Sequence, residues 1–177
     1  AYTRNKQLLT IPFESVAECL YLLENVAREV EFYVASRAMF YLAAAVSDFY
    51  VPRSDMHEHK IQSGDGDMHL TLRRVPKCLG LLTQHWAPSA YIVSFKLETD
   101  ETLLVAKAQR AISNYGVHLV VANQLQTRRD LVQIVDEGSV TRIERDNEAR
   151  IDDKLVDAVA ERFLAASQRD CQLAPAV

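Results

Sequence analysis

The sequence predicts an α/β domain built on a mainly parallel sheet. Three apolar runs read as buried strands, and the segments between them repeat apolar residues at helical spacing. Strand, helix, strand, helix, strand in this order is typical of parallel strands joined by right-handed crossovers. The 177 residues suffice for a substantial core, and no repeat or linker divides them, so we expect a single domain over residues 1–177.

The composition is that of an ordinary globular protein, with 49% hydrophobic and 25% charged residues. A formal net charge of −4 gives no general attraction to nucleic acid or to anionic membranes. No apolar run approaches a membrane span, and no signal peptide is visible. The cysteines match no metal or redox pattern, so we expect reduced thiols and a cytoplasmic protein. There is no initiator Met, so we do not expect Ala1 to be the native start.

The first third of the chain is expected to hold a short strand, a helix and the first buried strand. Residues 8–11 could form the short strand, before Pro12 prevents helix. Apolar residues at three- and four-residue steps over 14–36 predict an amphipathic helix that covers one sheet face. The uncharged run 38–46 suits a strand buried on both faces of a parallel sheet.

The middle of the chain predicts a projecting ribbon and a short helix. We expect 60–62 to pair with 69–73 as a β-ribbon, which could close as a flap over a site. The GDGD sequence at 64–67 fits neither a phosphate loop nor a calcium loop, so we interpret it as the ribbon's turn. Pro76 is expected to be the first residue of a helix over 76–86.

The last half predicts two further core strands, a hairpin and two helices. The strands are 91–95 and 117–122, the second ending on Asn123. Between them we expect a helix capped by Thr99 or Asp100 and ended by Gly116. Residues 131–135 and 139–144 are expected to form a hairpin. A last helix should cover about 152–167, with a frayed tail from 168. Its inward residues are expected to be Leu155, Val159, Phe163 and Leu164.

Small and polar residues follow the first predicted strand. Ser47 and Asp48 come where an open α/β sheet places its ligand crevice, at the carboxyl end of a strand. Lys60 adds a cation a little downstream. Small residues, a carboxylate and a lysine after a buried strand point to a site for a phosphorylated ligand.

Five sequence blocks make a resemblance specific. They are AAAVSDFYVP at 43–52, HKIQS at 59–63, VPK at 75–77, SFKLETD at 94–100 and VVAN at 120–123. Together they resemble, in the same order, the eukaryotic phosphopantothenate–cysteine ligases. The blocks and the sequence between them span about half of the chain. The resemblance implies a ligase of coenzyme A biosynthesis with a Rossmann-like three-layer sandwich.

The reaction implied by the resemblance has two steps and needs Mg²⁺. The carboxylate of 4'-phosphopantothenate attacks the α-phosphate of ATP, or of CTP in bacterial relatives, and pyrophosphate leaves. The amine of cysteine then attacks the acyl-nucleotide and expels the nucleotide monophosphate. The resemblance also implies a homodimer, for which the 14–36 helix and the 60–73 ribbon are candidate contacts.

Three residues carry the catalytic expectation that the resemblance implies. Lys60 would bind the nucleotide phosphates or balance the charge of leaving pyrophosphate, although a solvated lysine is the ordinary alternative. Asp48 would bind the nucleotide or a water of the magnesium shell, although it could instead cap a turn. Asn123 would hydrogen-bond ligand at the crevice, although a turn role is also open.

The other candidates would bind nucleotide or substrate. Ala44 and Ala45 would offer backbone groups to a closely approaching ligand, or serve tight core packing. Phe95, at a strand end, would pack on the base or belong to the core. Pro76 and Lys77 would sit at a helix start, where free N–H groups favour anions.

Two features limit the resemblance. The family's glycine-rich turn and an important asparagine lie upstream of all blocks, and this chain has no GxGxxG. We therefore expect the carboxy-terminal half to two-thirds of an enzyme, and keep a non-catalytic nucleotide-binding or dimerisation fragment as the alternative. A nicotinamide dehydrogenase is disfavoured because its fingerprint is absent. The histidines and cysteines lack metal-ligand spacing, so we expect no protein-bound metal. Bacterial relatives carry extra lysines where this chain has Lys107, Gln109 and Arg110, so nucleotide choice stays open.

Overall fold

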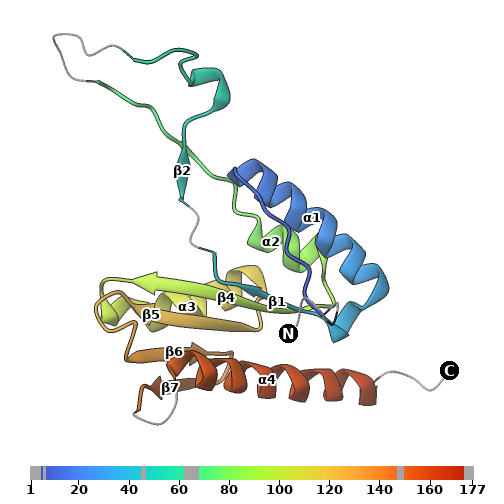
Figure 1. Cartoon of the computed structure of the whole chain (residues 1–177). Helices are drawn as coiled ribbons and strands as arrows, with labels where there is room; N and C mark the ends of the chain where they lie inside the picture. Colours follow the sequence, from blue (N-terminus) through green and yellow to red (C-terminus); the bar gives the residue numbers. More distant parts are fainter. Residues whose placement is uncertain (1–4, 6, 45–46, 62–67, 147–149, 174–177) are drawn as a thin grey trace.

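The computed structural model shows a sheet layered between helices, with a long arm extending from one end (Figure 1). It describes all residues except 1–4, 6, 45–46, 62–67, 147–149 and 174–177. We call the described residues 48–61 and 68–75 the arm and the rest of the described chain the body.

The sheet has five strands in the order β1-β4-β5-β6-β7. The parallel strands are β1 (Met39–Leu42), β4 (Tyr91–Glu98) and β5 (Leu119–Gln124). They are followed by β6 (Leu131–Val135) and β7 (Val140–Glu144), which pair antiparallel as the predicted hairpin. The α/β class with a mostly parallel sheet between helices is therefore confirmed.

Helices cover both sheet faces and make two separate cores. On one face lie α1 (Val16–Tyr33), the short α2 (Leu79–Leu81) with the π-turn η3 (Leu82–Trp86), and α3 (Glu101–Tyr115). The other face is covered by α4 (Ile151–Leu173). Side chains alternate between the faces along β4 and β5, so both strands supply both cores. The first core contains Ala27, Leu82, Ile92, Leu104 and Val120, and the second contains Val93, Leu119, Val121, Ile134 and Val159.

Local capping explains where the helices of the first face begin and end. The side chain of Ser15 accepts a hydrogen bond from the N–H of Glu18 and starts α1. Asp100 does the same for Thr102 at the start of α3. Gly116 ends α3 with a φ of 69°, which favours glycine. The predictions for Asp100 and Gly116 are confirmed.

The first strand differs from its prediction. β1 ends at Leu42 and is only half buried, so the expectation of a strand buried on both faces is wrong. Among the described residues it pairs with β4 alone, which leaves its outer edge without a neighbouring strand. Apolar composition made the run look central, but burial depends on neighbours that the run itself does not encode.

The arm also pairs differently from the prediction. Its two strands are β2 (Phe49–Tyr50) and β3 (Arg73–Arg74), which pair antiparallel at the base. Residues 60–61 and 68–72 are outside any strand, and residues 62–67 are outside the described part. Pro52 follows β2, and its missing N–H cannot continue a ladder. A 3-10 turn, η2 (Arg53–Asp55), comes next.

The helix predicted to start at Pro76 begins later, at Leu79. The N–H of Val75 donates to the carbonyl of Asp48 at 2.9 Å, which extends the ribbon by one residue. A residue before proline also favours extended backbone, so the chain cannot turn into a helix here.

Three smaller expectations are corrected. Residues 8–11 form no strand, and a 3-10 turn η1 (Ala35–Arg37) follows α1. The last helix continues to Leu173, beyond the predicted end. Leu155 and Phe163 pack on the second core and Val159 is buried in it, but Leu164 is 57% exposed. The face of α4 is therefore narrower than the apolar pattern suggested.

Candidate functional site

The carboxyl ends of β1, β4 and β5 meet at one edge of the sheet, which we call the carboxyl edge (Figure 1). Ala44 follows β1 there and is exposed. Phe95 lies in the second half of β4 and Asn123 near the end of β5. Ala45 lies outside the described residues. The edge thus gathers three of the residues selected from sequence.

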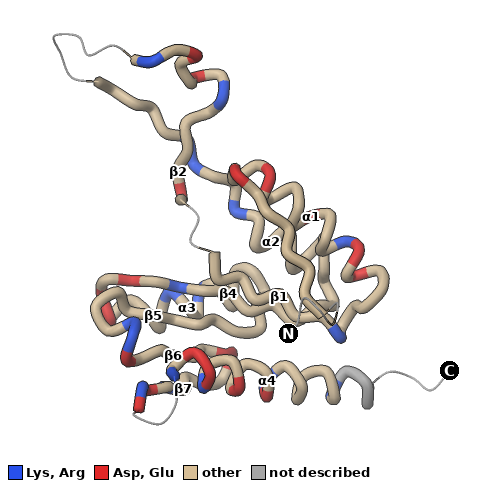
Figure 2. The backbone as a smooth tube through the Cα atoms, viewed as in Figure 1, with Lys and Arg blue, Asp and Glu red and all other residues tan. Residues whose placement is uncertain are grey.

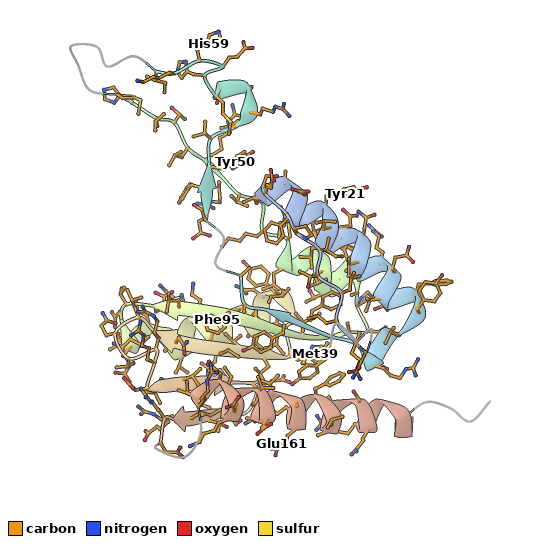
Figure 3. All side chains as sticks on the ribbon, viewed as in Figure 1. Tyr21, Met39, Tyr50, His59, Phe95 and Glu161 are labelled. Carbon is orange, nitrogen blue, oxygen red and sulfur yellow. The ribbon has the colours of Figure 1, made fainter. Side chains whose placement is uncertain are left out.

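Asn123 and Phe95 share the sheet face that α4 covers. Phe95 pairs with Val121 and Leu97 with Asn123, so the two residues lie diagonally on neighbouring strands. Phe95 packs against the second core, and Figure 3 shows it on the sheet rather than at its tip. The expectation of a strand-end Phe95 is wrong, because pairing with β5 extends β4 to Glu98.

The amide of Asn123 has an unusual environment. Its Oδ1 is buried and accepts no hydrogen bond from the described part of the chain. A buried acceptor without a partner costs about 1 to 3 kcal/mol, so such groups call for an explanation. A ligand that donates to this oxygen would supply one.

Tyr41 approaches the same region from β1. It pairs with Val93 and so shares the α4 face with Phe95. Burial raises the pKa of the Tyr41 phenol, and the charge of Asp152 in the first turn of α4 raises it further. The carboxyl edge therefore also contains a neutral phenol and the acidic start of α4.

On the sheet face that α3 covers, a cluster of charged side chains lies at the end of β4. The carboxylate of Glu98 contacts Lys96 Nζ at 3.0 Å with one oxygen and Lys107 Nζ at 2.7 Å with the other. The Glu98 side chain is only 14% exposed, whereas the lysines are 39% and 38% exposed. The hydrogen bond from Lys107, aided by Lys96, holds the pKa of Glu98 below its ordinary range.

Backbone hydrogen bonds tie this cluster to the turn between β5 and β6. The N–H of Leu125 donates to the carbonyl of Glu98 at 2.8 Å. Arg128 donates to the carbonyl of Leu125, and Arg129 lies exposed beside it. Figure 2 shows both basic and acidic segments at this end of the sheet. The carboxyl edge therefore carries basic side chains beside acidic ones, which include Asp100 and Glu101 at the start of α3.

The remaining sequence-selected residues belong to the arm or follow it. Asp48 is exposed at the arm's base, and its carbonyl helps to close the ribbon. Pro76 and Lys77 are exposed between β3 and α2 and do not start a helix. Lys60 follows His59, which Figure 3 places near the far end of the arm. The structure thus does not bring Lys60 next to Asn123 or Phe95.

Sequence reasoning missed the cluster around Glu98. One signal was available, because alternation in a strand puts Lys96 and Glu98 on one face. The sequence does not show that Lys107 lies beside Lys96 and Glu98, because this depends on how α3 packs on the sheet. Sequence reasoning also gave no sign of a groove of about 800 Å³ at the opposite edge, lined by residues that include Tyr91, His118 and Arg162. There His118 stacks on Tyr91, and Arg162 contacts Asp136.

The described residues contain neither a metal-binding cluster nor a membrane-spanning helix. No group of three or more histidine, cysteine, aspartate or glutamate side chains among them is arranged to hold a metal ion. No described helix combines the length and apolar character needed to cross a membrane.

Comparison with known proteins identifies relatives. The chain is 44% identical over 155 residues to phosphopantothenate–cysteine ligase 2 of Oryza sativa, covering 87% of this chain and 48% of that protein. It is 43% identical over 162 residues to the phosphopantothenate–cysteine ligase of Homo sapiens, covering 89% and 52%. The chain therefore spans about half the length of these relatives.

Solved structures agree with the fold. A Cab2 variant in complex with phosphopantothenate-cysteine superposes with a TM-score of 0.88 at 37% identity, covering 96% of this chain and 57% of that one. The DNA/pantothenate metabolism flavoprotein from Streptococcus pneumoniae gives 0.66 at 18% identity, covering 90% and 78%, which supports the fold alone. The family model described as DNA/pantothenate metabolism flavoprotein C-terminal domain matches residues 10–169. The resemblance seen in the sequence is confirmed, and the chain belongs to this family.

Proposed function

We propose that this chain is the part of a phosphopantothenate–cysteine ligase that binds nucleotide and substrate at the carboxyl edge. The observation that carries the proposal is the buried Oδ1 of Asn123 near Phe95, which accepts no hydrogen bond from the residues that the structure describes. Parallel α/β sheets bind ligands outside the carboxyl ends of their strands, where this oxygen lies. The relatives named as phosphopantothenate–cysteine ligases supply the reaction class.

The proposed chemistry transfers an acyl group through a nucleotide. The carboxylate of 4'-phosphopantothenate attacks the α-phosphate of ATP, and the bond to pyrophosphate breaks. The amine of cysteine attacks the acyl carbon of this intermediate, loses a proton and displaces the nucleotide monophosphate. CTP is the alternative co-substrate. In such reactions the protein mainly positions groups and neutralises charge.

Each residue can be given a role in that scheme. Asn123 would donate to or accept from the nucleotide, and Phe95 would limit the space beside it. Exposed Ala44 would offer its backbone to the substrate, and Asp48 would hold substrate or a water of the nucleotide's Mg²⁺. Because the described residues hold no metal cluster, Mg²⁺ would enter with the phosphates. Lys60 would act only when the arm bends toward this edge or reaches the edge of a second copy.

We further propose a cytoplasmic homodimer. Cys19 and Cys78 are free thiols, as is usual in a reducing compartment. The arm exposes large apolar side chains that contact between two copies would cover. These are Phe49, Tyr50, Met56, Ile61, Met68, Leu70 and Leu72.

A second candidate is a fragment that binds nucleotide or dimerises without turnover. Two observations favour it: among the described residues β1 pairs with β4 alone, and the chain covers about half of each relative. An exposed strand edge is a template for another strand, so this edge suits contact with a second copy. One assay separates the two candidates.

The assay is pyrophosphate release from ATP with Mg²⁺ and 4'-phosphopantothenate, with and without cysteine. We expect release to require phosphopantothenate and to fall at least about a hundredfold in Lys60→Ala, a loss of about 2.7 kcal/mol in barrier terms. Asn123→Ala should also lower it, whereas Asn114→Ala, which removes an exposed amide from α3, serves as the matched control. No pyrophosphate release by the wild type above the level of an inactive Lys60→Ala would reject catalysis by this chain alone and favour the fragment.

A further inference from the structure

At the carboxyl edge, the ammonium groups of Lys96 and Lys107 both contact the carboxylate of Glu98. Each nitrogen contacts a different oxygen of Glu98, at 3.0 and 2.7 Å. In the described part of the chain, neither lysine has another ion pair within 4 Å. Each ammonium has three donors, and the contact with Glu98 uses one of them. The cluster therefore keeps donors and a net positive charge.

The burial of the cluster is uneven in an informative way. Glu98 is 14% exposed, while both ammonium-bearing side chains remain more than a third exposed. The acceptor thus lies inside and the donors face outward at the end of β4. A carboxylate in this position fixes two flexible side chains, and the loss of their rotamer freedom no longer opposes ligand binding.

Charges of both signs surround the cluster. The carboxylate of Asp100 lies near Lys107 but already accepts from both the N–H and the hydroxyl of Thr102. Glu101 follows it in the first turn of α3, and Asp130 is paired with Arg145 at 3.6 Å. Arg128 and Arg129 lie on the turn that is bonded to the Glu98 carbonyl through Leu125. Because acidic residues balance these arginines, the suitability for an anion depends on the lysine pair itself.

We propose that Lys96 and Lys107, held by Glu98, bind a phosphate group of the ligands at the carboxyl edge. The inference rests on the proposed function, which supplies two phosphate-bearing ligands. One source is the polyphosphate of the nucleotide, and the other is the phosphate ester of 4'-phosphopantothenate. Glu98 is a positioning residue in this site, since it contacts the lysines rather than the phosphate.

Direct binding tests the proposal without turnover. Isothermal titration of the chain with inorganic pyrophosphate, and separately with 4'-phosphopantothenate, is compared for the wild type, Lys96→Met and Lys107→Met. Methionine keeps an apolar stem and removes the ammonium. We expect each variant to bind at least one of the two ligands about tenfold or more weakly, which is the scale of a lost hydrogen bond to a charged group. Arg28→Met, which removes a paired cation from α1, is the control for net charge.

Glu98→Gln gives the readout that a purely structural cluster would not change. The amide oxygen of glutamine still accepts a hydrogen bond from a lysine and so keeps that lysine in position, while the negative charge beside the bound phosphate is removed. The same ligand should therefore bind more tightly. A structural ion pair predicts lower stability in all three variants with unchanged binding. Urea unfolding of each variant confirms that the protein titrated is folded.

The outcomes separate the ligand sources and the two proposals. Weakening confined to pyrophosphate assigns the lysines to the nucleotide, and weakening confined to phosphopantothenate assigns them to the substrate ester. Three results would overturn the site. The wild type could bind neither ligand, the lysine variants could bind with the affinity of Arg28→Met, or Glu98→Gln could bind more weakly than the wild type. A chain that binds as expected but releases no pyrophosphate would retain this site and lose the proposed activity.

Discussion

The body and the arm of this molecule are built on different principles. In the body, β4 and β5 send alternate side chains into two cores, each closed by helices. In the described part of the arm, only Pro52 and Val75 are buried, and the ribbon has two residue pairs. Figure 1 shows the arm extending away from the sheet. The body is thus stabilised by its own burial, whereas the arm's apolar residues need a partner to bury them.

The largest expected effect is a difference in unfolding free energy between two matched Leu→Ala variants, one in the body and one in the arm. Leu119 is fully buried in the second core, so Leu119→Ala should destabilise the fold by about 2 to 5 kcal/mol through lost burial and a cavity. Leu72→Ala removes the same atoms from the arm, where 52% of that residue is exposed, and should change stability by less than about 0.5 kcal/mol. Urea unfolding monitored through Trp86 measures both.

Sedimentation equilibrium of the same variants examines the arm's role. If the arm mediates the proposed homodimer, Leu72→Ala should shift the mass toward the monomer without lowering the unfolding free energy of the monomer. A large loss of monomer stability in Leu72→Ala would contradict the comparison, because it would show that the arm packs on the body.

A smaller effect tests whether backbone conformation contributes to the stability of the body independently of side-chain packing. Gly116 has a φ of 69° and open space around it, so Gly116→Ala should cost about 1 to 2 kcal/mol from strain alone. Gly138 also has open space but no positive φ, so Gly138→Ala is the matched control and should be neutral within about 1 kcal/mol. Equal unfolding free energies for the two variants would argue against strain at the end of α3.

The smallest expected effect is a change in pH dependence at the carboxyl edge. The pKa of Glu98 is lowered in the fold from its ordinary value of 4.5, chiefly by the hydrogen bond from Lys107. Its stabilising contribution is present above that value and is lost as the pH falls through the lower folded pKa. Glu98→Gln and Lys107→Met should therefore both flatten the fall in stability below about pH 5. Urea midpoints from pH 7 to 3 measure this, and identical slopes in all three proteins would refute it.

Much of the candidate site was accessible from sequence because its residues lie in or just after the core strands. The blocks around Asp48, Phe95 and Asn123 carried the family resemblance, and Ala44, Phe95 and Asn123 do gather at one edge. The partners of these side chains were not accessible. The environment of the Asn123 oxygen, which has no partner among the described residues, depends on which strands and helices lie beside it, and so do the lysines around Glu98.

The sequence by itself determined the elements of the body. Apolar periodicity specified the core strands and helices, while Asp100 and Gly116 bounded α3, because these signals act within a few residues of chain. The tertiary structure alone decided that β1 lies at an edge, that β4 continues to Glu98, and that the arm pairs at its base. Each of these depends on hydrogen bonds between segments distant in sequence, and a short pattern does not encode which strand will be its neighbour.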